Sequence, residues 1–123
     1  MRVLIADDEK GVGSTLAALV ERCGHDVLQV VKTGWEAIQA YSRLRPDIVL
    51  MDYNMPRLNG ATASRMILAR DPAAKIILVS GVTLPPQLSD TGVIAILRKP
   101  VALDKLYGAL YDAAPSQPDH GRP

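Results

Sequence analysis

The sequence predicts an α/β fold, a single doubly wound five-stranded parallel sheet with helices on both faces. Four continuous apolar runs, rich in Val, Ile and Leu, begin at Val3, Ile48, Ile76 and Ile94, and such runs are typical of strands that are buried on both faces. Segments of helical periodicity lie between the strands, and this alternation favours right-handed crossovers within one sheet. The length of 123 residues suits one domain.

The expected strands are short and separated by room for a helix. They are predicted at residues 2–6, 27–31, 47–51, 75–79 and 93–97. Strands connected in this way fit the order 2-1-3-4-5, in which the chain begins one strand in from the edge of the sheet.

Local signals mark the ends of the helices. Gly24 suits the end of the first helix, because glycine adopts the left-handed backbone conformation that often follows a helix. Thr33 followed by Glu36 is the pattern of an N-terminal capping box for the second helix. Pro46 requires that helix to end near Leu44. Helices are predicted at residues 12–23, 34–44, 60–70 and 102–114.

The connection between the fourth and fifth strands is short for a helical crossover. Eighteen residues separate Ser80 from Lys99, and part of them forms the fifth strand. A crossover needs at least about ten to twelve residues, and Pro85 and Pro86 each disfavour helix at the preceding residue. We therefore expect helix 4, at residues 86–91, to be short or distorted.

Composition excludes several classes of protein. Apolar residues make up 48% of the chain, and the formal net charge of +1 comes without the basic stripe that binds nucleic acid over a broad face. No apolar run reaches the length of a membrane span and no signal peptide precedes the first strand, so we expect a cytoplasmic protein that binds no membrane. Cys23 is the only cysteine, which excludes an intramolecular disulfide and a zinc cluster.

Side chains that can handle a phosphoryl group follow four of the expected strands. Asp7 and Asp8 follow the first strand, Asp52 the third, Ser80 the fourth and Lys99 the fifth. Ligands of doubly wound sheets bind beyond the carboxyl ends of the strands, so these groups are expected at one edge. Each alone has a structural explanation, as a turn former, a helix cap or a solvated charge. Together they indicate a divalent cation and a phosphoryl group.

Asp7, Asp8 and Asp52 are candidate metal ligands. Carboxylates close together repel one another unless a cation or a shared proton lies between them. Three carboxylates with no His or Cys nearby favour a hard, oxygen-binding cation. Mg²⁺ fits best, because it takes few protein ligands and shares phosphate oxygens.

Asp52 is also the candidate nucleophile, whose carboxylate could become an acyl phosphate. The transition state of phosphoryl transfer is loose and anionic, so it needs neutralising charge more than a base. Mg²⁺ on one side and Lys99 on the other would supply that charge. The Ser80 hydroxyl could donate to a phosphoryl oxygen beside the flexible Gly81.

These residues, in this order and each after its own strand, resemble the receiver domain of bacterial two-component response regulators, which has a flavodoxin-like fold. The resemblance covers residues 3–114 and includes the loop 55–60 after the candidate nucleophile. It implies a receiver domain at residues 1–114. The polar, Pro-rich residues 115–123 are then a flexible C-terminal tail or a truncated linker.

The resemblance implies partners and a metal. Asp52 would take phosphate from a phosphohistidine of a sensor histidine kinase or phosphotransfer protein, and the domain would then change its binding to a downstream protein target. Asp8, Asp52 and the main-chain carbonyl of Asn54 would bind Mg²⁺ directly, with Asp7 acting largely through water. Such a domain is a signalling module and not an enzyme, and we expect a monomer or weak dimer.

The resemblance also implies contacts to the phosphoryl group, and it has one departure. Ser80 and Lys99 would contact phosphoryl oxygens, and the peptide bond between Lys99 and Pro100 would be cis, an uncommon state even before proline. The family usually has an aromatic residue three positions before the lysine, whereas this chain has Ile96. Ile96 is β-branched and stiff, so we expect no large side-chain rotation there.

Two other functions stay open at this point. A Mg²⁺-dependent phosphohydrolase also uses an Asp nucleophile, but haloacid-dehalogenase-like enzymes place a second Asp two residues later, which neither Asp7 nor Asp52 has. A flavodoxin-type cofactor carrier would bind phosphate after the first strand, where Asp7, Asp8 and Glu9 would repel it.

Overall fold

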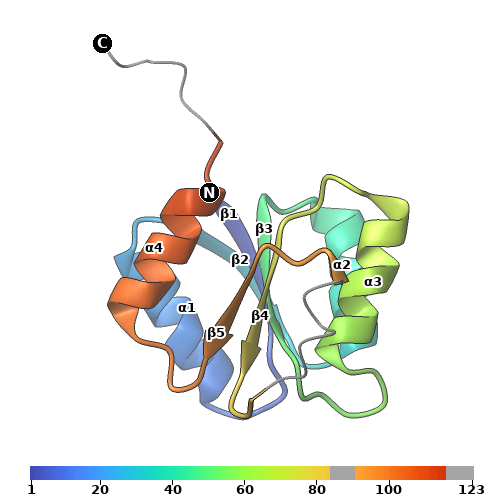
Figure 1. The fold of residues 1–123 in the computed structure, drawn as a ribbon, viewed down its shortest axis with the longest axis horizontal. Helices are drawn as coiled ribbons and strands as arrows, with labels where there is room; N and C mark the ends of the chain where they lie inside the picture. The colour runs from blue at the N-terminus through green and yellow to red at the C-terminus, as the bar shows by residue number, and fades with distance from the viewer. Residues whose placement is uncertain (84–90, 116–123) are drawn as a thin grey trace.

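The computed structural model describes residues 1–83 and 91–115 (Figure 1). The described elements, in chain order, are β1 (Arg2–Ala6), α1 (Val12–Arg22), β2 (Asp26–Val31), α2 (Gly34–Leu44), β3 (Ile48–Asp52), α3 (Gly60–Arg70), β4 (Ile76–Ser80), β5 (Ala95–Arg98) and α4 (Leu103–Ala113). None of these helices has the length and apolar character that crossing a membrane requires.

The five strands form one parallel sheet in the order β2-β1-β3-β4-β5, which confirms the predicted fold class. β3 and β4, inside the sheet, are buried at every position. β5 lies at the edge and alternates between half-buried and exposed residues.

Helices cover both faces of the sheet (Figure 1). α1 and α4 lie on one face, and α2 and α3 on the other. Successive strand residues point to opposite faces, so β1 to β4 supply both cores, whereas the edge strand β5 supplies only the core under α1 and α4. The core under α1 and α4 is built around Leu16, Val20, Leu106 and Leu110, and the core under α2 and α3 around Ala37, Ile38, Tyr41, Ala63 and Ile67.

β3 and β4 each begin and end one residue later than the sequence predicts, and β5 covers residues 95–98 in place of the predicted 93–97. Asp52 is the last residue of β3 and Ser80 the last of β4. They stay in the ladder because Asp52 pairs with Val79, and Ser80 with Arg98. The backbone of both residues is therefore fixed by the sheet, and not by a loop.

The predicted helix ends are largely observed. The Thr33 hydroxyl accepts a hydrogen bond from Glu36 N–H at 3.0 Å, as in a capping box. The Glu36 carboxylate instead accepts from Lys32 N–H at 2.9 Å, one residue before the capping residue. Gly24, just after α1, has a φ of 89°, in the left-handed region that glycine accepts at low cost.

The structure describes only part of the connection between β4 and β5 and of the C-terminal tail. Of the expected short helix 86–91, the structure describes only Thr91, and residues 116–123 of the expected tail also lie outside the described part of the chain. The peptide bond between Lys99 and Pro100 is cis, as expected.

Candidate functional site

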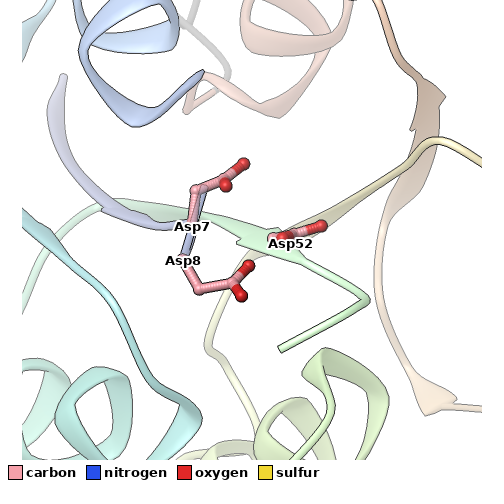
Figure 2. Close-up of side chains that lie close together, drawn as sticks. All are labelled: Asp7, Asp8 and Asp52. Atoms are coloured by element: carbon pink, nitrogen blue, oxygen red, sulfur yellow. The ribbon is translucent and has the colours of Figure 1, made fainter. Parts of the chain in front are cut away.

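The carboxyl edge of the sheet brings three aspartates together. Asp7 directly follows β1, and Asp52 ends the neighbouring strand β3. Carboxylate oxygens of Asp7, Asp8 and Asp52 all lie within 4.8 Å of one another, and Figure 2 shows the three side chains at this edge. The structure thus gathers the carboxylates that the sequence predicts as metal ligands.

Lys99 lies among these carboxylates. Its Nζ is 2.9 Å from Asp7 Oδ2, 3.2 Å from Asp52 Oδ1 and 3.1 Å from Glu9 Oε1. Burial by itself lowers the pKa of Lys99, but the contacts with Asp7, Glu9 and Asp52 outweigh burial and hold the pKa above its usual range. The ammonium therefore stays charged at any physiological pH.

The carboxylates fit a hard cation. Asp7 and Asp52 are each only 2% exposed. Within the described residues, Asp8 Oδ1 and Asp52 Oδ2 are buried without a hydrogen-bond partner, and Asp7 Oδ2 has only its ion pair with Lys99. Buried charged oxygens left in this way cost free energy unless a cation or donor compensates them. An all-oxygen set is the donor type that Mg²⁺ prefers.

The surroundings of Asp52 disfavour the ionised form of its carboxyl group. Burial and the negative charge of Asp7 raise its pKa to about 6, while Lys99 and the Asn54 N–H act in the opposite direction. At neutral pH the Asp52 carboxylate is ionised but poorly compensated. Such a group gains from any added positive charge.

We expect Asp52→Asn to stabilise the metal-free protein by about 1–2 kcal/mol at pH 7, somewhat less than the full pKa shift implies because water and neighbouring charges screen it. The raised pKa means that folding favours the protonated carboxyl, so wild-type stability falls as the pH rises from about 4 to about 6. The gain in the free energy of unfolding should therefore grow over that range and level off above it.

Urea unfolding in EDTA, as a function of pH, measures this gain. Saturating Mg²⁺ should reverse its sign, because a cation favours the ionised form. Equal stability of the two proteins in EDTA at every pH would contradict the electrostatic account of Asp52.

Ser80 and Asn54 lie next to the cluster without joining it. The buried Ser80 hydroxyl donates to the Val82 carbonyl at 2.9 Å and accepts from Val82 N–H at 3.1 Å. Asn54 N–H donates to Asp52 Oδ1 at 3.3 Å, and the Asn54 side chain is exposed. Their roles toward a phosphoryl group and a metal remain predictions.

Sequence reasoning missed the contact that Glu9 makes with Lys99. It treated Glu9 only as one more negative charge after the first strand. The available signal was the unbroken run Asp7-Asp8-Glu9, placed where a cation from another strand end could be reached. Glu9 and Lys99 are 90 residues apart in the sequence, so no local pattern indicates that they pair.

A groove of about 530 Å³ borders the acidic cluster. Its lining includes Lys99 and Glu9, together with Lys10, Thr15 and apolar side chains such as Val12, Leu16 and Val101. The site is thus open to solvent beside an apolar surface.

Gly60, the first residue of α3, packs directly on the backbone of Asp52. A Cβ atom at this position would lie 2.2 Å from the Asp52 carbonyl oxygen, far inside contact distance. Gly60 N–H also donates to the Tyr53 carbonyl at 2.7 Å. The loop after Asp52 can turn back into α3 only with a residue that lacks a side chain here.

The fold and the site together define a class of protein. A five-stranded sheet in this order, with clustered aspartates and a lysine at its carboxyl edge, fits a module that accepts a phosphoryl group. The chain belongs to the family of response regulator receiver domains, whose family model matches residues 3–111. The resemblance seen in the sequence is confirmed.

Individual relatives agree with this assignment. The chain is 31% identical to the chemotaxis protein CheY of Listeria monocytogenes over 117 residues, 93% of this chain and 98% of CheY. It is similar to a LuxR-family two-component response regulator from Aurantimonas sp. SI85-9A1, with a TM-score of 0.85 and 27% identity over 90% of this chain and 82% of the other.

A further neighbour supports the fold alone. The crystal structure of the CheX-CheY-BeF3-Mg²⁺ complex from Borrelia burgdorferi matches with a TM-score of 0.86 at 24% identity, covering 91% of this chain and 87% of that one.

Some relatives are much longer than this chain. It is 38% identical over 109 residues to a protein-glutamate methylesterase/protein-glutamine glutaminase of Methanospirillum hungatei, but the match spans only 31% of that protein. Receiver domains are signalling modules and not themselves enzymes.

Proposed function

We propose that Asp52 accepts a phosphoryl group from a phosphohistidine of a sensor histidine kinase or phosphotransfer protein, and that this changes the binding of a downstream protein. The main support is the position of Asp52: buried in a cluster of carboxylates, with its pKa raised and Lys99 Nζ 3.2 Å away. Receiver-family membership disfavours the phosphohydrolase alternative.

The site would work with Mg²⁺. Asp8 and Asp52 would hold the ion together with the main-chain carbonyl of Asn54, and Asp7 would act largely through water. The bound ion would supply positive charge against the anionic transition state. The unpartnered oxygens of Asp8 and Asp52 support this assignment.

Lys99 and Ser80 would contact the phosphoryl oxygens. Lys99 already lies beside the carboxylate that would be modified. The Ser80 hydroxyl has one hydrogen to donate, so a contact with a phosphoryl oxygen would replace its hydrogen bond to the Val82 carbonyl, and modification of Asp52 would be coupled to the chain that follows β4. The rest of that connection, residues 84–90, lies outside the described residues.

The groove beside the cluster is our candidate docking surface for the phosphodonor protein. Val12, Leu16 and Val101 are among its lining residues, and so is Lys99, which lies beside the acceptor. A partner that buried its own apolar side chains there could present a phosphohistidine to Asp52. We propose that the domain acts in the cytoplasm as a monomer or weak dimer and binds no nucleic acid itself.

Incubation with acetyl phosphate and Mg²⁺ tests the proposal directly. A carboxylate oxygen of Asp52 forms a bond to phosphorus as the bond between phosphorus and the acetyl oxygen breaks, and acetate leaves. We expect one phosphoryl group per chain, on the peptide that contains Asp52, by mass spectrometry. A phosphoryl group on another residue would overturn the assignment.

The metal assignment has its own test. Mg²⁺ should bind with a dissociation constant on the order of a millimolar, as expected for a site of few carboxylates. Asp8→Ala should abolish measurable binding in a calorimetric titration, because it removes a buried oxygen of the cluster. Asp104→Ala, on the exposed start of α4, is the control and should bind as wild type. Unchanged affinity in Asp8→Ala would show that the ion lies elsewhere.

A further inference from the structure

We propose that Glu9 is a positioning residue that competes with the phosphoryl group for the ammonium of Lys99, an inference that rests on the proposed function of Asp52. Glu9 is neither a predicted metal ligand nor a predicted phosphoryl contact. The structure nevertheless places its Oε1 3.1 Å from Lys99 Nζ, in a hydrogen bond and an ion pair.

The number of donors on Lys99 sets up the competition. An ammonium group has three hydrogens to donate and no acceptor. Three carboxylates already face it, those of Asp7, Glu9 and Asp52. A phosphoryl group on Asp52 ends the ion pair of that carboxylate, so its oxygens would share the ammonium with Asp7 and Glu9, and each of these two contacts draws Lys99 away from the group.

Glu9 is the contact that is cheapest to lose. Once Asp52 is modified, the carboxylates left on Lys99 are those of Asp7, whose side chain is 0% exposed, and Glu9, whose side chain is 61% exposed. A buried carboxylate that loses its cation pays a large desolvation cost, but an exposed one is taken up by water. The free carboxylate of Glu9 would simply turn to solvent.

The backbone holds Glu9 in place for this role. Glu9 N–H donates to Asp7 Oδ1 at 2.9 Å, and the Glu9 carbonyl accepts from Val12 N–H at 3.1 Å at the start of α1. The contact with Lys99 is therefore made from a fixed turn. It keeps the ammonium at the mouth of the site while Asp52 is unmodified, and it weakens the hold of Lys99 on the incoming group.

Two variants separate the contact from the mere charge of Glu9. Glu9→Gln removes the charge. Glu9→Asp keeps the charge but shortens the side chain by one methylene, about 1.5 Å, which takes the carboxylate out of hydrogen-bond range of Nζ. Glu21→Gln, an equal charge change at an exposed position late in α1, is the matched control.

The measurement is the affinity for beryllofluoride, a phosphoryl mimic, at saturating Mg²⁺, with Mg²⁺ affinity alone as a second readout. We expect both Glu9→Gln and Glu9→Asp to bind beryllofluoride about two- to fivefold more tightly than wild type, the range set by one exposed ion pair. Glu21→Gln should match wild type. Mg²⁺ affinity of Glu9→Asp should stay within about twofold of wild type, because the charge of the cluster is kept.

Other results would overturn the inference. Tighter binding in Glu9→Gln alone would mean that only the charge of Glu9 matters, and unchanged or weaker binding in both variants would mean that Glu9 does not compete for Lys99. Failure of the wild-type protein to bind beryllofluoride at all would instead overturn the proposed function of Asp52.

Discussion

Asp52→Asn should show no phosphoryl adduct after incubation with acetyl phosphate and Mg²⁺, whereas the wild-type protein should take up one group. The amide of asparagine has nearly the shape of the carboxylate but lacks the anionic oxygen that attacks phosphorus. The variant keeps the partners that Lys99 finds in Asp7 and Glu9. Intact-mass measurement over a time course checks the result.

The control for this variant is Asp104→Asn, which changes an exposed aspartate of α4 and should be modified like wild type. The raised pKa of Asp52 in the wild type predicts that the metal-free Asp52→Asn variant is the more stable protein. If it is, misfolding cannot explain a loss of modification in this variant. An equal adduct on wild type and Asp52→Asn would place the acceptor on another residue.

The sequence was sufficient for the fold because strand and helix signals agreed with each other. The apolar runs at Val3, Ile48 and Ile76 became strands buried on both faces. The strand order followed from the alternation of elements, and the observed order is the predicted one. The bounds were less certain, because backbone pairing extends β3 and β4 to include Asp52 and Ser80.

The sequence was also sufficient to gather the candidate site, since residues after parallel strands must meet at one edge. It could not show how side chains pair there. Asp7, Asp52 and Lys99 were expected, but the contact between Glu9 and Lys99 depends on the shape of one turn. The hydrogen bonds of Ser80 with Val82 likewise depend on local backbone geometry.

Ile96 stands where the resemblance to the family leads us to expect an aromatic residue. Ile96 lies on the edge strand β5 with 41% of its surface exposed, and Ile94, just before this strand, is 47% exposed. A side chain so placed, and stiff at its first torsion, is a poor reporter of events at Asp52. We therefore expect the response to phosphorylation in the backbone after Ser80, whose hydroxyl donates a hydrogen bond to the Val82 carbonyl.

Gly60→Ala should destabilise the protein by about 3 kcal/mol or more, a large part of the stability of a small domain. The new Cβ would lie 2.2 Å from the carbonyl oxygen of Asp52 and 2.9 Å from the Cα of Tyr53, both backbone atoms that cannot rotate away. Relief requires the end of β3 or the start of α3 to move. The same movement would displace Asp52, so Mg²⁺ binding should weaken together with stability.

Gly108→Ala is the matched control, because it makes the same chemical change in a different setting. Gly108 lies inside α4, and a Cβ there would meet nothing within 4 Å. Alanine has the higher helix propensity, so this variant should gain about 0.5–1 kcal/mol. Urea unfolding gives the free energy of unfolding of both variants. It therefore compares the same substitution at a glycine that the site requires and at one that it does not. A Gly60→Ala protein within about 0.5 kcal/mol of wild type would show that β3 and α3 are free to separate, and that Asp52 does not depend on their close contact.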